Sequence, residues 1–451
     1  IVSDPIGEAM VGPGIRFWEF ARVLSRYMTV TLAAPPMIPM PAVPPQPDFP
    51  AEIALCRTTA SLRMVVETAE VIITLGGILA QYPFLADMGK PLVLDLYDPF
   101  LLTGLPKFSD RPLPERLTRN EGDRRTHAIQ IRAADFMICG SERQRDYWLG
   151  MLAGLGRINP FTSDDDPALY RLIDVVPFGL PAEPPRHQRQ VLKGVYKSIS
   201  AQDKVILWGG GLWNWFDATA MIEAMAIIRQ HRPEVKLFFM GIERPNSTVP
   251  KMAVVEQAIA LSRELELYDR CVFFNDWTLY QERQNYLLEA DIGVSLHFNN
   301  AETRFAYRTR FLDYLWAGLP VLATEGDVLS DLIRTWDLGQ VVKVGDVEGI
   351  ARAALAMLDR PDLRETCRPR FEQVSARYHW DEVTRPLLEF CLNPRLAPDK
   401  AYLKDIPLFE NNKRPWWSLP EKTWRVARQQ GVRGLSYKIE EYLRWKLNWR
   451  S

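Results

Sequence analysis

Two runs of short apolar segments, each alternating with helical patterns, constrain the fold of this 451-residue chain more than any other feature. Buried strands that alternate with helices are typical of a parallel sheet covered by helices on both faces. We therefore expect an α/β chain with two doubly wound domains that face each other across a cleft, with ligands beyond the carboxyl ends of the strands. The expected strands are 1–4, 28–34, 71–77, 91–100, 135–141 and 172–181 in the first run, and 205–208, 235–241, 271–277, 291–298 and 319–327 in the second.

A polar, proline-containing stretch after Pro181 indicates a linker between the two runs. A chain of this length is also too long for one core, so two or three domains are expected. We place the first domain at residues 1–182, the second at 183–378 and a helical extension at 379–451.

The composition narrows the class of protein and its compartment. A net charge of -1 excludes a general attraction to nucleic acid or anionic membrane, although not a local patch. The five cysteines are far apart and lack CxxC spacing, which argues against a disulfide framework or a zinc site and fits a reduced, cytoplasmic protein. No apolar run approaches the length that spans a bilayer.

A glycine-rich segment near the amino terminus precedes a helical pattern. A strand, a glycine loop and a helix can together aim backbone N–H groups at a phosphate. Gly12 and Gly14 would let the backbone approach such a ligand, and Arg16 would add charge. A tight turn with a surface arginine is an equal alternative.

Asp95 and Asp98 lie at the end of one expected strand, where ligands bind in parallel sheets. An aspartate there can accept a proton or orient a sugar hydroxyl. Capping of a helix or turn is the common alternative for a single aspartate. The pair makes Asp98 a candidate catalytic residue.

The stretch 302–324 holds the densest charge in an otherwise apolar neighbourhood. Its first twelve residues contain three arginines, one glutamate and one aspartate, and an expected helix, a glycine-proline turn and an apolar strand follow. This arrangement favours a site for an anionic ligand, with a solvated charged face as the alternative. The charged residues are Glu302, Arg304, Arg308, Arg310 and Asp313.

A triple glycine follows the first strand of the second run. Gly210 and Gly211 would allow close approach to a ligand, and Trp213 and Trp215 follow them directly. The two indole rings can stack on a base or sugar. Sealing of the interface between the domains is the slightly favoured alternative for the tryptophans.

The motifs LLEADIGVSLHF, RFLDYLWAGLPVLATEGD, VVPFGLP and SERQRDYW resemble those of the family 4 (group 1) glycosyltransferases, which have the GT-B fold. The resemblance implies two Rossmann-like domains with the donor in the second. It also implies a retaining, metal-independent transfer from a nucleotide-diphosphate sugar to a glycan or lipid-linked acceptor, with no cofactor besides the nucleotide-sugar substrate. Surface polysaccharide biosynthesis is the process that the resemblance suggests.

The resemblance assigns roles to single residues. Asp313 matches a family carboxylate that holds ribose hydroxyls, and Arg310 matches a basic position before it. Glu325 follows the next strand and borders the donor. Phe305 stands where a first family glutamate is expected, so Glu302, three positions earlier, is the candidate catalytic carboxylate.

The basic pair that usually follows the second-domain glycine turn is absent, because Gly211 and Phe216 stand at its positions. We hypothesise that arginines of the later stretch replace this pair on the donor diphosphate. Arg304 and Arg308 are four residues apart and would share one face of a helix, whereas Arg310 would point elsewhere.

The carboxyl-terminal stretch 411–451 contains ten Lys or Arg, three Glu and five Trp. We predict peripheral membrane contact here, at the inner face of the membrane, because basic residues interleaved with tryptophan suit a membrane interface. Packing of the tryptophans on the first domain is the alternative. The preceding segment HWDEVTRPLLEF resembles the helix that returns to the first domain in GT-B enzymes.

Two other functions stay open from the sequence. A GT-B nucleotide-sugar epimerase would convert donor without an acceptor. A non-catalytic nucleotide-sugar-binding or scaffold subunit would explain the missing family charges.

Overall fold

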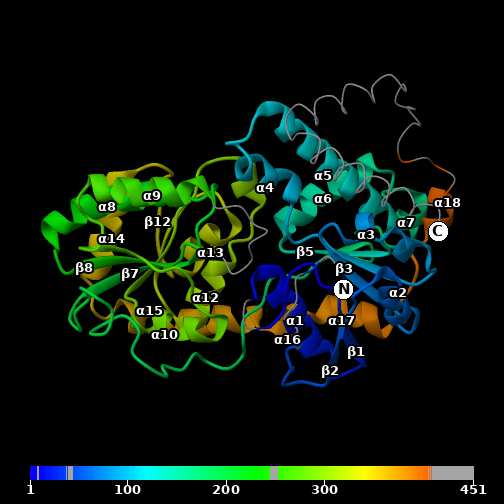
Figure 1. The fold of residues 1–451 in the computed structure, drawn as a ribbon, viewed down its shortest axis with the longest axis horizontal. Helices are drawn as coiled ribbons and strands as arrows, with labels where there is room; N and C mark the ends of the chain where they lie inside the picture. Colours follow the sequence, from blue (N-terminus) through cyan, green and yellow to red (C-terminus); the bar gives the residue numbers. More distant parts are fainter. Residues whose placement is uncertain are drawn as a thin grey trace. The chain divides into compact units, whose positions relative to one another are not determined.

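The computed structural model describes residues 1–7, 10–36, 38, 44–243, 252–404, 406 and 408. One compact unit covers Ile1–Leu403, and a second begins at Lys404 (Figure 1). The stretch 411–451, with its predicted membrane contact, lies outside the described residues. Within the described ranges, no helix combines the length and the apolar character needed to cross a bilayer.

The first half of the chain forms a four-stranded parallel sheet, in the order β3-β4-β5-β6, and a separate two-stranded parallel sheet of β1 and β2. The predicted strand at residues 1–4 is irregular, although Val2 N–H donates to Ala33 O at 3.0 Å beside β1. The strands are β1 (Val30–Ala34), β2 (Ala51–Leu55), β3 (Ile72–Leu75), β4 (Leu92–Asp95), β5 (Phe136–Cys139) and β6 (Ile173–Val175). The helices are α1 (Gly12–Leu24), α2 (Thr59–Glu67), α3 (Ile78–Gln81), α4 (Phe100–Lys107), α5 (Leu113–Ala133), α6 (Glu142–Gly154) and α7 (Pro160–Asp165).

The second half forms a six-stranded parallel sheet in the order β12-β11-β10-β7-β8-β9. The chain proceeds from β7 to one side and then returns to build the other, so the topological switch point lies between β7 and β10. The strands are β7 (Lys204–Gly211), β8 (Val235–Gly241), β9 (Val272–Phe274), β10 (Ile292–Ser295), β11 (Val321–Thr324) and β12 (Gly339–Val342). The helices are α8 (Ala218–His231), α9 (Ala253–Glu264), α10 (Arg283–Glu289), α11 (Ala301–Phe305), α12 (Thr309–Ala317), α13 (Val328–Trp336), α14 (Val347–Leu358) and α15 (Leu363–Ser375).

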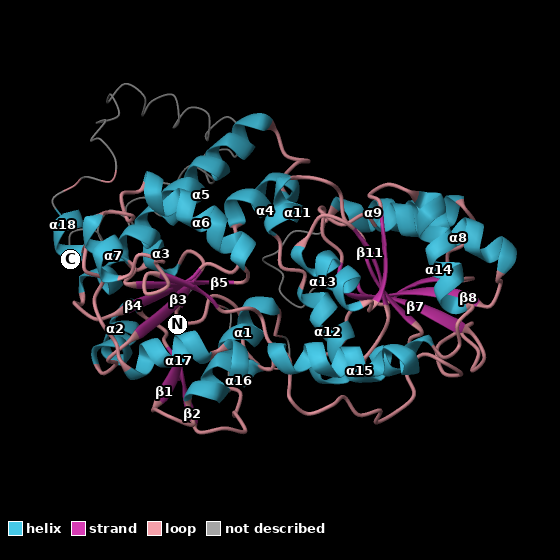
Figure 2. Ribbon diagram, turned by 180° about the vertical axis from the view of Figure 1, so that it is seen from behind, coloured by secondary structure: helices cyan, strands magenta, loops and turns pink. Residues whose placement is uncertain are grey.

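Helices lie above and below each of the two larger sheets (Figure 2). The central strands are buried on both faces, which explains their continuous apolar sequences. The architecture confirms the predicted pair of doubly wound α/β halves. Strands β2 and β12 were not predicted, because AEIAL follows a proline-rich stretch and GQVV is short and only half-buried.

After residue 378 the chain returns to the first half through α16 (Trp380–Val383) and α17 (Arg385–Leu392). The backbone N–H of Trp380 donates to Leu180 O at 3.1 Å, and the Trp380 ring lies edge-on to Phe20 at 5.9 Å. The ring of Phe390 stacks on Phe136 of β5 at 4.7 Å. The final helix predicted to cross back is therefore packed on the first sheet.

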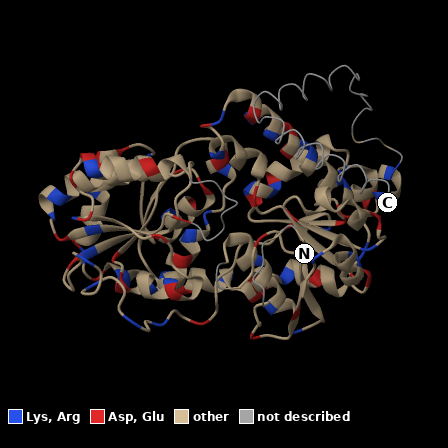
Figure 3. Cartoon of the chain, viewed as in Figure 1, with Lys and Arg blue, Asp and Glu red and all other residues tan. Residues whose placement is uncertain are grey.

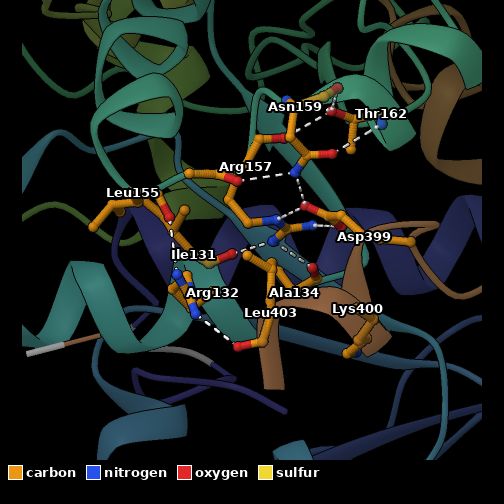
Figure 4. A network of polar contacts seen from close by, with 12 residues as sticks. Ile131, Arg132, Ala134, Leu155, Arg157, Asn159, Thr162, Asp399, Lys400 and Leu403 are labelled. Carbon is orange, nitrogen blue, oxygen red and sulfur yellow. Dashed lines mark hydrogen bonds and ion pairs between the residues drawn. The ribbon is translucent and has the colours of Figure 1, made fainter. Parts of the chain in front are cut away.

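A buried polar network then anchors the following segment on the first half, just before and within α18 (Lys400–Lys404) (Figure 4). Arg157 donates to both carboxylate oxygens of Asp399, at 2.8 and 3.2 Å, and to the carbonyls of Ile131 and Ala134. Asn159 adds a third donor to Asp399 at 3.1 Å. The side chains of the ion pair are at most 1% exposed.

Candidate active site

The charged stretch 302–313 folds as two helices with a break between them. Asn300 caps α11 by accepting the N–H of Thr303 at 3.0 Å. The backbone is extended at Ala306, and Arg308 is the N-cap residue of α12. Arg304 and Arg308 therefore do not share one helical face, which corrects the prediction from their spacing.

Arg308 forms a bidentate ion pair with Glu302 in the interior. The two N–O distances are 2.8 and 2.6 Å, and the side chains are 5% and 2% exposed. The Arg308 guanidinium also lies over the ring of Phe216 at 5.0 Å. Its Nε has no hydrogen-bond partner within the described part of the chain. Buried polar atoms nearly always have partners, so this donor is available to a ligand.

Arg310 holds the glycine turn that ends β7. Its Nη2 donates to the carbonyl of Gly211 at 2.7 Å, and its guanidinium lies 3.8 Å from the ring centroid of Phe216. Burial lowers the pKa of Arg310 to about 10. Its Nη1 also lacks a partner among the described residues. Gly210, which precedes Gly211 in this turn, has a φ of +79°, a conformation that favours glycine.

Tyr314 of α12 joins this turn to the centre of the sheet, which the sequence did not predict. Its hydroxyl accepts the N–H of Gly209 at 2.7 Å and contacts the carbonyl oxygens of Leu207 and Val294 at 3.0 and 2.9 Å. A side chain at Gly209 or at Gly293 would collide with the Tyr314 ring. Gly209 and Gly293, which lie in separate strands, are the sequence feature from which this packing could have been predicted.

Asp313 and Glu325 each pair with an arginine that the sequence analysis did not single out. Asp313 accepts from Arg283 Nε at 2.8 Å and keeps 35% of its side chain exposed. Glu325 pairs with Arg334 at 2.8 Å on a half-exposed surface. Asp313 is thus an accessible carboxylate held in place by a buried cation, as a residue that binds hydroxyls requires.

Asp98 follows β4 in the first half and lies near Glu302 of the second half. Burial, and then the charge of Glu302, raises the pKa of Asp98 to about 6, although nearby cations oppose the shift. The amide of Gln144 bonds to the carbonyls of Tyr97 and Phe305, at 2.8 and 2.9 Å, and so links the same two segments. The two predicted catalytic carboxylates therefore come together from opposite halves of the chain.

The glycines of the predicted phosphate loop at the amino terminus lie in the first turn of α1, and their contact with a phosphate stays a prediction. Gly12 and Gly14 are helical, and a side chain on Gly14 would lie 2.5 Å from Pro5 O. Arg16 is fully buried, where it pairs with Asp95 and donates to the carbonyls that follow β6. These contacts give Arg16 a structural role and do not agree with the predicted contact to a donor.

Trp213 and Trp215 stack on each other at 4.7 Å with nearly parallel rings. The Lys107 ammonium of α4 lies 5.6 Å from the Trp213 ring, and Asn214 Nδ2 donates to Lys107 O at 3.3 Å. These contacts favour the predicted alternative in which the tryptophans seal the two halves against each other.

An open cavity of about 400 Å³ lies between the halves, beside α6 and α11. Arg143 lines it from the first half and donates to the carbonyl of Gly326 and to Asp331. Arg304 and Asn299 line it from the second half. Arg304, predicted to bind the donor beside Arg308, therefore faces a different part of the site.

The described residues contain no group of three or more His, Cys, Asp or Glu side chains that could hold a metal ion. His297 is fully buried, with its Nε2 3.4 Å from Asp327. Burial would raise the pKa of Asp327, but His297, the charge of Arg308 and the N–H of Ser330 together outweigh it and hold that pKa below the ordinary value. Asp327 accepts that N–H as the N-cap residue of α13, which fits a structural pair.

Among known protein families, one matches part of the second half of the chain. Residues 203–360 match the family model described as glycosyl transferases group 1. No curated protein sequence matches the chain.

Solved structures match most of the chain at low sequence identity. Sucrose-phosphate synthase from Thermosynechococcus elongatus has a TM-score of 0.59 and 15% identity, covering 86% of this chain and 98% of its own. Anabaena HepE in complex with UDP has a TM-score of 0.57 and 14% identity, covering 86% and 99%. WaaG, a glycosyltransferase involved in lipopolysaccharide biosynthesis, has a TM-score of 0.53 and 16% identity, covering 86% and 98%. These similarities establish the GT-B fold.

Proposed function

We propose that this chain, which has the GT-B fold, is a group 1 glycosyltransferase that moves a sugar from a nucleotide-diphosphate sugar to a glycan or lipid-linked acceptor. Transfer would retain the anomeric configuration and need no metal. We place it at the inner face of the cytoplasmic membrane, in the synthesis of a surface polysaccharide.

The observation that carries this proposal is the pair of unpartnered donors on Arg308 and Arg310. Both atoms are buried and have no partner among the described residues. Both guanidinium groups lie over the ring of Phe216, and Arg310 also donates to Gly211 O in the glycine turn at the switch point. A diphosphate would satisfy them with charge-assisted hydrogen bonds and would be stabilised as a leaving group. The guanidinium groups thus replace the basic pair that this chain lacks after its glycine turn.

Carboxylates on either side of the arginines supply the remaining roles. Asp313 would hold the ribose hydroxyls. Asp98 would orient the acceptor hydroxyl or accept its proton. Its pKa of about 6 leaves the carboxylate ionised at neutral pH, and this value is close enough to neutral pH for a general base. Glu302 would keep Arg308 in place and face the transferred sugar.

The test is incubation of the full chain with nucleotide sugars, with and without a glycan or lipid-linked acceptor. UDP-glucose is the first donor to test, because HepE was solved with UDP and with UDP-glucose. Nucleotide release that depends on acceptor supports transfer. Conversion of the donor without acceptor would support an epimerase, and a complete lack of donor binding would support a scaffold.

A further inference from the structure

The open cavity beside α6 and α11 is lined by two arginines, one asparagine and one glycine, which are Arg143, Arg304, Asn299 and Gly326. Its volume of about 400 Å³ lies within the range of roughly 300–1,000 Å³ that small-molecule sites have. Most such sites are lined by hydrophobic side chains, whereas guanidinium groups suit carboxylates and phosphates. The lining therefore favours a ligand that carries an anionic group.

Arg304 brings a charge to this cavity that no carboxylate of the described ranges balances. It is exposed, and its guanidinium lies 5.8 Å from the ring centroid of Phe305. Three arginines of adjoining segments, Arg143, Arg308 and Arg334, each pair with a carboxylate instead. Basic and acidic residues are also interspersed over both halves (Figure 3). The charge of Arg304 is thus a local feature that attracts an anion.

Arg143 supplies the second guanidinium from the opposite wall. Its Nη1 donates to the carbonyl of Gly326 at 3.2 Å, and its Nη2 pairs with Asp331. These contacts fix the guanidinium at the wall, while Asp331, whose side chain is 49% exposed, offsets its charge. The two lining arginines and this carboxylate together carry a net charge of +1. An anion in the cavity would neutralise it.

Both walls of the cavity continue into the segments that carry the candidate catalytic carboxylates. Arg304 follows Glu302 by two residues in α11. Gln144, next to Arg143 on α6, donates to the carbonyl of the residue before Asp98 at 2.8 Å and to a carbonyl of α11 at 2.9 Å. A group bound in the cavity can therefore belong to a substrate that reaches these carboxylates.

The donor diphosphate is assigned to a different place, at the buried donors of Arg308 and Arg310. Glu302 and Thr303, which both contact Arg308, are buried in α11, whereas Arg304 is exposed. Arg304 therefore faces away from Arg308. An anion beside Arg304 is a second anion, distinct from the diphosphate.

We propose that this cavity is a subsite for a carboxylate or phosphate group on one of the two sugars that the enzyme joins, held between Arg304 and Arg143. That the ligand is a sugar rests on the proposed function, whereas the preference for an anion rests on the cavity. The amide of Asn299 would bond to a hydroxyl group of the same sugar.

The test compares the binding of acidic and neutral sugars to the full chain. Glucuronate and glucose 6-phosphate are compared with glucose by NMR titration, with and without saturating UDP. UDP-glucuronate is compared with UDP-glucose by calorimetry. A preference among the free sugars assigns the anion to the acceptor, and a preference among the nucleotide sugars assigns it to the donor. The acidic ligand of that set should bind about tenfold more tightly, and sodium chloride should weaken the preference.

Arg304→Gln, which removes the charge and keeps a polar side chain, should bring the ratio of the two affinities close to one. Arg143→Gln is a second probe from the opposite wall if the first variant does not fold. Arg360→Gln, at an exposed arginine just after α14, is the matched control and should keep the preference of the wild type.

Equal binding of acidic and neutral ligands by the wild type in both sets, or a preference that survives in Arg304→Gln, would overturn the proposal. The proposed function is read separately. Failure to bind UDP and UDP-glucose would contradict that function, while the free sugars measured without UDP still report on the cavity.

Discussion

Two buried arginine–carboxylate pairs in this molecule differ in how completely the arginine is bound. Arg157 uses Nε and both terminal nitrogens, on Asp399 and on two carbonyl oxygens (Figure 4). Arg308 uses its terminal nitrogens on Glu302 and Thr303, while its Nε has no partner in the described part of the chain. Both pairs are almost completely removed from solvent.

The difference separates a structural anchor from a binding group. A buried charge is tolerated when every donor nitrogen has a partner, as at Arg157, where Nε, Nη1 and Nη2 all make hydrogen bonds within the protein. The unoccupied donor at Arg308 is a cost to the free protein that a ligand can remove. Removal of the first pair should therefore affect stability, whereas removal of the second should affect ligand binding most.

The largest expected effect is on stability. Asp399→Ala leaves the Arg157 guanidinium buried without a counter-charge, and it should lower the free energy of unfolding by about 3–5 kcal/mol. Urea denaturation measures the change. Asp381→Ala is the control, because it removes a half-exposed partner of Arg26 and should cost below about 1 kcal/mol. An equal loss of unfolding free energy in the two variants would contradict the assignment of the Arg157–Asp399 pair as a structural anchor.

Arg308→Ala should lower kcat/KM for transfer by about 10²- to 10³-fold, because a preorganised donor to the leaving diphosphate is lost. It should also abolish most of the stabilisation that saturating UDP-glucose gives the wild type, about 2.7 kcal/mol at one hundred times Kd. Enzyme kinetics and thermal melts with ligand measure the two effects. Arg352→Ala, on an exposed face of α14, is the control. An Arg308→Ala protein that UDP-glucose stabilises as strongly as the wild type would contradict the assignment.

Tyr314→Phe tests whether the glycine turn must be anchored for the arginines to act. Loss of the hydroxyl leaves the buried N–H of Gly209 unpaired and should cost about 1–3 kcal/mol in unfolding free energy. We expect KM for the donor to rise more than kcat falls. Tyr402→Phe, at a half-exposed ring, should change neither quantity. An unchanged KM would show that Tyr314 supports the fold alone.

The smallest expected effect is in the pH dependence. Because the pKa of Asp98 is about 6, kcat/KM should fall roughly tenfold per pH unit below 6, as a required carboxylate is protonated. Asp98→Asn should remove this limb of the profile at low residual activity. A profile with the same limb in Asp98→Asn would assign it to another group.

The same pKa shift predicts the sign of a stability change. The folded protein holds the Asp98 proton more tightly than the unfolded chain, whose value is near 3.8, so this group lowers stability as pH rises from about 4 to 6. Asp98→Asn should therefore be more stable than the wild type at pH 7 and equal to it below about pH 4. Urea denaturation at both pH values measures this difference.

Much of the fold followed from local patterns. The continuous apolar runs predicted β7, β8, β10 and β11 near their observed bounds, because strands buried on both faces need apolar side chains at every position. Asp98 was singled out at the end of an expected strand and Glu302 through the family resemblance, but their approach to each other was not predicted. The prediction that Arg304 and Arg308 share a helical face was wrong, because the helix ends at Ala306 without a proline or glycine that would have indicated the break.

The sequence alone determined the alternation of strands and helices, the position of the switch-point glycines and the charge of the stretch 302–313. Only the tertiary structure decided which arginine meets which carboxylate. Arg16 reaches Asp95 across 79 residues, and Arg157 reaches Asp399 across 242. Periodicity is a local property of the backbone, whereas an ion pair depends on segments that folding brings together. Whether an arginine serves as an anchor or as a binding group therefore depends on how many of its donor nitrogens have no partner after the chain has folded.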